Sequence, residues 1–105
     1  MNTKQEHINE MCLDVYKKAF DEYLNGESNV SRLRKCSAEV YETAGYFLLR
    51  SYRTLVAVVE KSTGNTYDIL RVAYGYTVTS AQHIAKFSND YGNGKRYTWR
   101  EIPHR

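Results

Sequence analysis

The residues best suited to do chemistry lie in one short segment, 74–87, which reads YGYTVTSAQHIAKF. Ser80 and His83 are three residues apart there, so on a helix the imidazole would lie one turn from the hydroxyl and could act as its base. A serine nucleophile also needs a group that orients the base, and no Gly-x-Ser-x-Gly elbow is present. Catalysis is therefore the weakest of three interpretations, and we expect no enzymatic activity.

The second interpretation of this segment is structural. Thr79 followed three residues later by Gln82 fits a capping box, and Ser80 is the alternative cap one residue later. Ile84 and Phe87 would then form the buried face of the helix. This pattern predicts a short helix over residues 79–91.

The third interpretation is nucleic-acid binding. The segment GNGKRYTWR, residues 92–100, interleaves lysine and arginine with tyrosine and tryptophan beside glycines, which suits backbone contacts combined with base stacking. A helix N-terminus attracts phosphate, and Gln82 is able to pair with adenine. We therefore expect a nucleic-acid or partner surface made of Tyr74, Tyr76, His83, Lys86, Lys95, Arg96, Trp99 and Arg100.

Metal and cofactor chemistry have little support in the sequence. The two cysteines, Cys12 and Cys36, form neither a disulfide framework nor a metal quartet, and His7 with Glu10 has helical spacing but no further ligand. Cys12 falls on an apolar helical stripe, which predicts a buried, inert thiol. We expect no metal and no cofactor.

An amphipathic helix is predicted at the N-terminus, over residues 1–26. Its apolar residues recur at three- and four-residue spacing for about four turns, and Asn25–Gly26 supplies a stop. The stripe packs either on the chain's own sheet, which is the default, or on a partner. The outer face is acidic, with Glu6, Glu10, Asp14, Asp21 and Glu22.

Strands are predicted over residues 36–74 and again over 95–102. KSTGNTYDIL turns a β-branched run back through Gly64, as hairpins do. Residues 30–37 are ambiguous and could form a short helical turn. The order of elements predicts a single α+β domain over residues 1–105, with both helices on one face of a small, mainly antiparallel sheet of four to five strands.

The charge distribution is more informative than the net charge of +3. Residues 1–30 hold three basic against six acidic residues, whereas residues 31–105 hold 12 against 6. Such asymmetry fits a nucleic-acid or an acidic partner. Because the sequence shows no signal peptide and no apolar run of about 18 residues, we expect a cytoplasmic protein, neither secreted nor membrane-spanning.

Nearly half of the chain resembles a family of small proteins carried by phages, plasmids and integrated elements of Firmicutes. The resemblance lies in S-Y-x-T-x-V-A, K-x-T-G-x-x-Y-D, Y-G-Y-T-x-T-S-A-Q-H-I-x-K-F, and D-Y-G before a Tyr/Trp/Arg strand. It brings no catalytic or ligand residues with it. In that setting the size and composition also look like those of a small anti-CRISPR protein, which inhibits a type II RNA-guided nuclease.

This second resemblance implies stoichiometric binding to the nuclease or its guide-RNA complex, because such a nuclease holds RNA and DNA in basic grooves. Either the acidic helix would occupy a DNA groove, or the basic–aromatic surface would hold guide RNA or DNA beside the nuclease. The alternative is a small regulator of a phage or plasmid that binds DNA or RNA directly. Monomer and homodimer both remain open.

Overall fold

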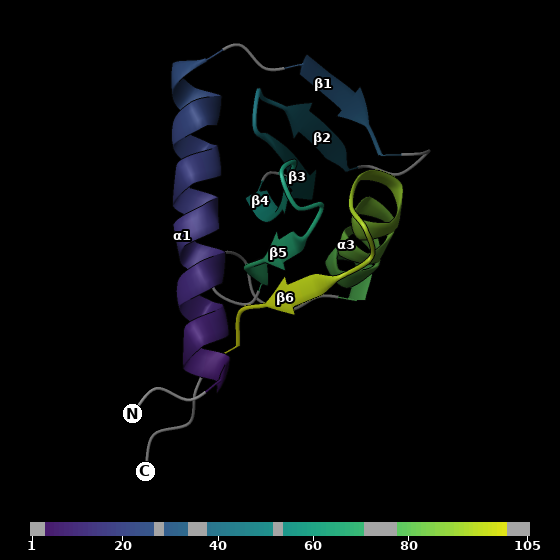
Figure 1. Ribbon diagram of the computed structural model, residues 1–105. Helices are drawn as coiled ribbons and strands as arrows, with labels where there is room; N and C mark the ends of the chain where they lie inside the picture. The colour runs from purple at the N-terminus through teal and green to yellow at the C-terminus, as the bar shows by residue number, and fades with distance from the viewer. Residues whose placement is uncertain (1–3, 27–28, 34–37, 52–53, 71–77, 101–105) are drawn as a thin grey trace.

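The structure is a computed structural model and describes residues 4–26, 29–33, 38–51, 54–70 and 78–100. Six strands form one sheet in the order β1-β2-β3-β4-β5-β6, antiparallel throughout except for the parallel pair β5–β6 (Figure 1). The elements are α1 (Lys4–Asn25), β1 (Asn29–Arg32), β2 (Glu39–Glu42), β3 (Tyr46–Ser51), β4 (Thr54–Glu60), β5 (Thr66–Asp68), α3 (Val78–Tyr91) and β6 (Arg96–Thr98).

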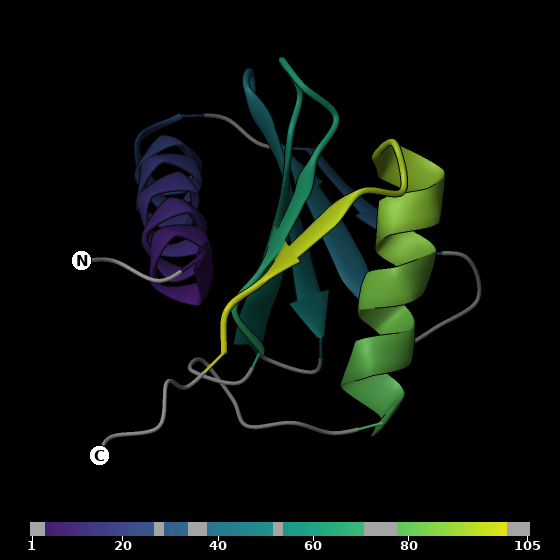
Figure 2. The same ribbon diagram turned by 60° about the horizontal axis from the view of Figure 1, so that its bottom comes forward.

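The two helices lie on opposite faces of the sheet, as Figure 2 shows. The prediction that both would cover one face was therefore wrong. The reason lies in the central strands, where neighbouring residues such as Leu48 and Leu49 are both buried although they point to opposite faces. A sheet that is apolar on both faces needs a covering layer on each side.

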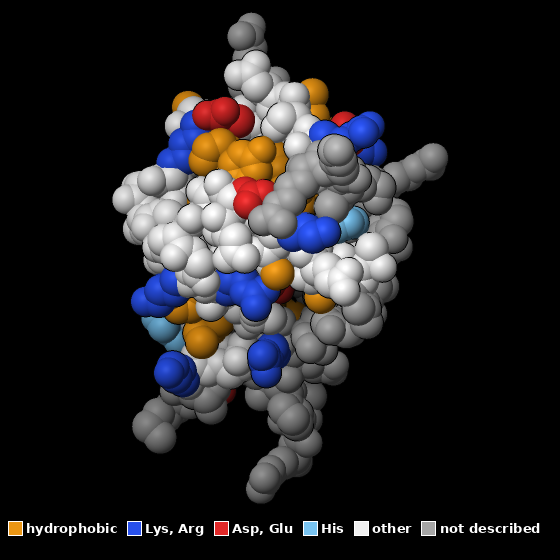
Figure 3. Space-filling model, turned by 90° about the vertical axis from the view of Figure 1, so that its right-hand side faces the viewer, with side chains coloured by type: hydrophobic (Ala, Val, Ile, Leu, Met, Phe, Trp, Pro, Cys, Tyr) orange, Lys and Arg blue, Asp and Glu red, His pale blue; other side chains and the backbone are white. Residues whose placement is uncertain are grey.

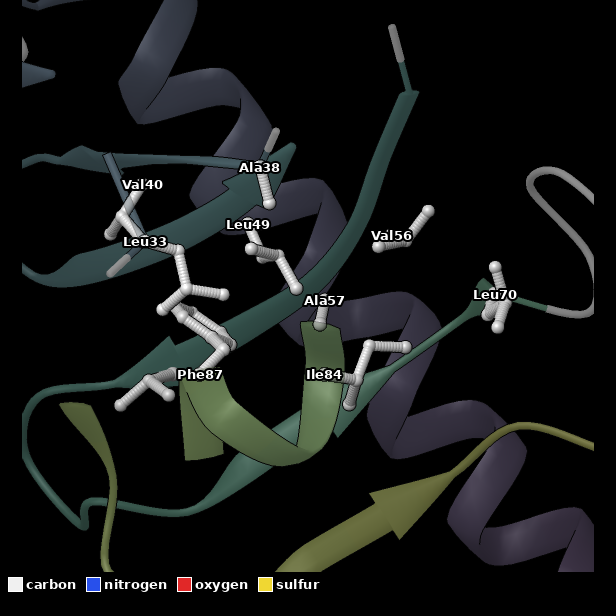
Figure 4. Close-up of a cluster of buried hydrophobic side chains, with 10 residues drawn as sticks. Leu33, Ala38, Val40, Leu49, Val56, Ala57, Leu70, Ile84 and Phe87 are labelled. Carbon is white, nitrogen blue, oxygen red and sulfur yellow. The ribbon is translucent and has the colours of Figure 1, made fainter. Parts of the chain in front are cut away.

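The fully buried core on the α3 side is aliphatic apart from Phe87, and the half-buried rings of Phe47 and Tyr91 pack against it. Figure 4 shows Phe87 and Ile84 of α3 beside side chains of the sheet, among them Leu49 and Ala57. Phe87 is fully buried. The spacing of Ile84 and Phe87 on α3 is the one that the sequence predicted, and it fixes which face of this helix meets the sheet.

The core on the α1 side is built from the apolar stripe of the long helix. Cys12, Val15 and Ala19 pack against Leu48, Val58, Tyr67 and Ile69. Burial, followed by the charge of Asp68, raises the pKa of the Cys12 thiol to about 12. The prediction of a buried Cys12 is thus confirmed, and the raised pKa disfavours the thiolate, which is the nucleophilic form.

The α+β class, the long and short helices and the mainly antiparallel sheet are confirmed. The sheet has six strands rather than four to five. The difference arises at Asn29–Arg32, which forms the edge strand β1 and pairs with β2. The sequence pattern in this region was ambiguous and also fitted a short helical turn. The predicted hairpin is present between β4 and β5, with Gly64 at a φ of 79° that suits glycine.

Candidate nucleic-acid interface

A cleft of about 200 Å³ lies between β6 and α3, at the edge of the sheet. Its lining combines two arginines, a carboxylate, a hydroxyl and three aliphatic side chains, namely Arg96, Arg100, Asp68, Thr98, Leu70, Ala81 and Ile84. Figure 3 views the molecule from the side where α3 lies in Figure 1. Lys and Arg side chains gather across the lower half of that view, with hydrophobic patches between them.

The alternation of strand β6 sorts the predicted binding residues onto two different faces. Arg96, Thr98 and Arg100 line the cleft on the α3 side. Tyr97 and Trp99 pack instead against the core on the α1 side. Of the residues predicted to form one binding surface, Trp99 therefore lies on the other face from Arg96 and Arg100. Successive side chains of an extended segment point to opposite faces, so aromatic and basic residues that alternate in sequence cannot share a face.

Lys95 lies beside the aromatic residues of this segment and not beside the two arginines of the cleft. Its ammonium group lies 5.3 Å from the centre of the Tyr97 ring, which itself stacks on Tyr67. A hydrogen bond and the charge interaction with Tyr97 raise the pKa of Lys95. The ammonium group is thus part of a cation–π contact on the α1 side of the strand, and it does not line the cleft.

The turn between α3 and β6 is fastened to the β4–β5 hairpin. The backbone N–H of Asn93 donates to the Gly64 carbonyl at 2.8 Å, and the Asn93 side chain donates to the Thr63 carbonyl and to Asn65. A Cβ atom at Gly92 would come within 2.8 Å of the Gly64 carbonyl oxygen, so only glycine allows this approach. These contacts bring β6 alongside β5 and thereby set the position of Arg96.

Helix α1 fixes the other end of β6 from the opposite face. The Asn9 side chain donates to the Arg100 carbonyl at 2.7 Å and accepts from the Arg100 N–H at 3.0 Å. Gln5 donates to Asn9 and to the Thr98 carbonyl, and the Cys12 thiol donates to the Tyr97 carbonyl. These side chains pair with backbone groups on the edge of β6 in place of a further strand.

Sequence reasoning missed Asn9 and Gln5. Asn9 is buried next to the apolar stripe of α1, with 9% of its surface exposed. An amide on the apolar face of a helix was the one available signal, because a buried amide needs hydrogen-bond partners. The sequence could not indicate that the partner would be the backbone of a residue 91 positions away.

Asp68 supplies the acidic group of the cleft. Only 5% of its surface is exposed, and one carboxylate oxygen accepts a hydrogen bond from the Thr98 hydroxyl at 2.8 Å. Asp68 and Thr98 are register partners in the parallel β5–β6 pair, which explains why the two side chains meet. With two guanidinium groups and one carboxylate among the lining residues, the cleft carries a formal charge of +1.

Ser80 and His83 take part in a buried network rather than in a surface. The Ser51 hydroxyl lies 2.9 Å from the Ser80 hydroxyl and 2.9 Å from His83 Nδ1. Ser51 and Ser80 are fully buried, and 4% of His83 is exposed. His83, which the sequence placed on the predicted binding surface, is therefore enclosed between α3 and the sheet in this arrangement.

Burial, followed by the nearby charge of Lys86, lowers the pKa of His83. A neutral imidazole bonded to a serine hydroxyl satisfies a polar core without placing a charge there. The hydroxyl–imidazole pair noticed in the sequence is thus brought together by the fold, and Ser51 of β3 completes it. What the three groups form is a hydrogen-bonded core element between α3 and the sheet.

The remaining predicted residues are distributed as follows. Lys86 is half-buried on α3 and does not line the cleft. Tyr74 and Tyr76 lie outside the described residues. Helix α3 begins at Val78, one residue before the predicted cap, so Thr79 and Ser80 belong to its first turn.

The acidic residues of α1 lie across the sheet from the cleft. Glu10, Asp14 and Asp21 are exposed, and Asp14 pairs with Lys18 at 3.0 Å. Glu22 has a structural contact, since its carboxylate accepts a hydrogen bond from the Gly45 N–H at 2.6 Å. Hydrogen bonds from the Thr43 side chain and from the Gly45 backbone lower the Glu22 pKa. Glu22 therefore holds the β2–β3 turn.

Among the described residues, no three His, Cys, Asp or Glu side chains come together in a way that could hold a metal ion. Within the same part of the chain, no helix has the length and apolar character needed to cross a membrane. No protein-family model, curated protein or solved structure matches this chain.

Proposed function

We propose that this protein acts by stoichiometric, non-catalytic binding to nucleic acid, through the cleft between β6 and α3. One observation carries the proposal: Arg96 of β6 and Arg100, two residues beyond the end of that strand, line the same cleft. Guanidinium groups bind phosphate oxygens with two parallel hydrogen bonds, and backbone contacts of this kind supply most of the affinity for nucleic acid.

The charges around the cleft support the same proposal. Residues 78–100, which form α3 and β6, hold four basic residues against the single acidic residue Asp90, a net charge of +3. Helix α1 on the opposite face has three basic against five acidic residues, a net charge of −2. A nucleic acid would therefore be attracted to one face of the protein and repelled from the other.

The test is a binding titration of labelled single-stranded and duplex oligonucleotides at several salt concentrations. Arg96→Gln and Arg100→Gln should each weaken binding and each reduce the salt slope by about 1, because one phosphate contact is lost. Lys17→Gln removes a charge from the exposed face of α1 and should leave both quantities unchanged. No binding by the wild-type protein, or equal losses in all three variants, would refute the proposal.

A second candidate function is inhibition of a type II RNA-guided nuclease in the cytoplasm of a bacterial host. It is favoured by the resemblance to mobile-element proteins and by the separation of charge, which leaves Glu10, Asp14 and Asp21 exposed on α1. Such an acidic surface suits a DNA-binding groove, while the cleft would hold guide RNA or DNA beside the nuclease.

The inhibitor hypothesis predicts that target cleavage stops when roughly equimolar protein is added to nuclease and guide RNA. The combined variant Glu10→Gln, Asp14→Asn and Asp21→Asn separates the two routes. If it still inhibits while Arg96→Gln does not, the cleft makes the contact. Undiminished cleavage by several type II nucleases in the presence of wild-type protein would exclude this candidate.

A further inference from the structure

The two edges of the sheet, β6 and β1, differ in how they are covered (Figure 1). The outer edge of β6 is occupied by α1, since Gln5, Asn9 and Cys12 all pair with backbone groups of residues 97–100. Strand β1 forms the opposite edge, and all four of its residues are exposed. An open strand edge presents unpaired N–H and C=O groups, which proteins usually block. Within the described residues, β1 is therefore the edge that is open to a further strand.

The hydrogen-bond pattern shows which backbone groups of β1 point outward. The Leu33 N–H donates to the Ala38 carbonyl at 3.0 Å, and these two residues continue the β1–β2 register. Bonded and non-bonded residue pairs alternate along an antiparallel ladder. Ser31 is therefore also bonded to β2, whereas Val30 and Arg32 turn their N–H and C=O groups to the open side. Each copy of β1 thus offers two donors and two acceptors at the spacing of a strand.

These outward groups match those of a second copy of β1 that runs in the opposite direction. With a two-fold axis at Ser31, perpendicular to the sheet, Val30 of one copy lies opposite Arg32 of the other, and each such pair exchanges two hydrogen bonds. Ser31 then faces Ser31 of the second copy, where both side chains are small. Like charges directly opposite each other would be destabilising, and this register has none. The edge is therefore complementary to itself.

The side chains beside this edge support the same arrangement. Leu24 and Val30, which flank the connection from α1 to β1, are 63% and 55% exposed, the highest values for large aliphatic side chains among the described residues. Directly opposite residues of an antiparallel pair share a face, so the aliphatic part of Arg32 from the second copy would cover Val30. Glu39 is the register neighbour of Arg32 on β2, which places opposite charges side by side on that face.

We propose that two copies of this chain pair antiparallel along β1 and join their six-stranded sheets into one continuous sheet. A second copy is the occupant that the edge itself specifies, because the same residues serve as donors and acceptors on both sides of the axis. The axis keeps the α3 faces of both copies on one side, so the two β6–α3 clefts face the same way. The inference does not depend on nucleic-acid binding by those clefts.

Sedimentation equilibrium of the full chain without nucleic acid, from micromolar to millimolar concentration, tests the pairing. The apparent mass should rise from 12.2 kDa towards twice that value. Val30→Pro removes an outward N–H that makes no bond within one copy, and proline is tolerated on the open side of an edge strand. Because a hydrogen bond is lost on each side of the axis, this variant should dimerise about tenfold more weakly or not at all. Val30→Thr keeps the N–H and the β-branched shape and should dimerise like the wild type.

A cysteine placed at the two-fold axis tests the register. In a Cys36→Ser background the buried Cys12 is the only other cysteine. Ser31→Cys should form an intermolecular disulfide under oxygen with a copper catalyst, because the Cα atoms of a directly opposite, non-bonded pair are about 4.5 Å apart. Asn29→Cys is the matched control, also exposed and on the same face. Its two copies would lie about 13 Å apart along the strands, so it should cross-link far more slowly.

A wild-type chain that stays monomeric would overturn the proposal and leave a strand of another protein as the occupant of this edge. A dimer that persists in Val30→Pro, with folding verified by circular dichroism, would show that a different surface is used. If Val30→Pro does not fold, Ser31→Lys gives an independent answer, because it places two like charges opposite each other and should abolish the dimer. Equal cross-linking of Ser31→Cys and Asn29→Cys would also refute the pairing. Oligonucleotide binding by a monomer would leave the proposed function intact.

Discussion

The two faces of the sheet differ in what their polar groups do. On the α1 side, amide and thiol groups of the helix pair with the backbone of β6, and aromatic rings complete the core. On the α3 side, hydroxyl and imidazole groups pair with one another in the core, and two arginines remain to line a cleft. One face therefore holds the strand in place, while the other presents its basic side chains.

This comparison shows that the cleft depends on residues that do not touch it. The side chain of Arg100 lines the cleft. The backbone carbonyl and N–H of Arg100 are hydrogen-bonded to the side chain of Asn9, which belongs to α1 on the opposite face of the sheet. A short edge strand has little hydrogen bonding of its own, since β6 has three residues and one neighbour. Its geometry must come from side chains of other elements.

The largest effect should come from removing a core ring on the α3 side. Phe87→Ala should lower the free energy of unfolding by about 3–5 kcal/mol, because it leaves a cavity in a fully buried site. Phe20 on α1 is half-buried and stacks on Tyr16 and Tyr23, so Phe20→Ala should cost only about 1 kcal/mol. Urea unfolding measures both, and equal losses would contradict the difference in packing between the faces.

A smaller effect should follow from removing the hydrogen bonds between the Asn9 side chain of α1 and the backbone of Arg100. Asn9→Leu should lower the free energy of unfolding by about 1–3 kcal/mol, because the N–H and carbonyl of Arg100 lose their partners. It should also weaken oligonucleotide binding, although residue 9 lies on the opposite face from the cleft. Glu10→Gln is the matched control, exposed and adjacent in sequence, and should change neither quantity. Full binding by folded Asn9→Leu would mean that α1 does not position Arg100.

The smallest predicted effect is a pH dependence of the folding stability, which arises from His83 on the α3 side of the sheet. Burial and Lys86 lower the pKa of His83 in the folded protein below its unfolded value of about 6.5, so the folded state favours neutral imidazole. The stability that this group contributes is complete above that value and is lost as the pH falls from about 6.5 through the lowered pKa.

Urea midpoints measured between pH 8 and pH 5 test this dependence. His83→Asn should remove part of the loss at acid pH, whereas His7→Asn, at an exposed position on α1, should retain it. The same acid loss in wild-type protein and in His83→Asn would show that the buried imidazole is not its source.

Local patterns in the sequence predicted much of the fold. The three- and four-residue spacing predicted both helices, and the second helix was expected over 79–91 against Val78–Tyr91 in the structure. Gly64 indicated the β4–β5 hairpin because a positive φ there is a local requirement. The edge strand β1 was missed because all four of its residues are exposed, so it shows no alternation of buried and exposed positions.

The sequence by itself determined which residues alternate on the last strand, because the twofold period of an extended chain is a local property. It also contained Ser80, His83 and the arginines as candidate groups. Only the tertiary structure decided that His83 is enclosed with Ser51, that Trp99 joins the α1 core, and that Arg96 and Arg100 share a cleft with Asp68. Those pairings join elements far apart in the chain, and their energies come from burial and hydrogen bonding that no local spacing encodes.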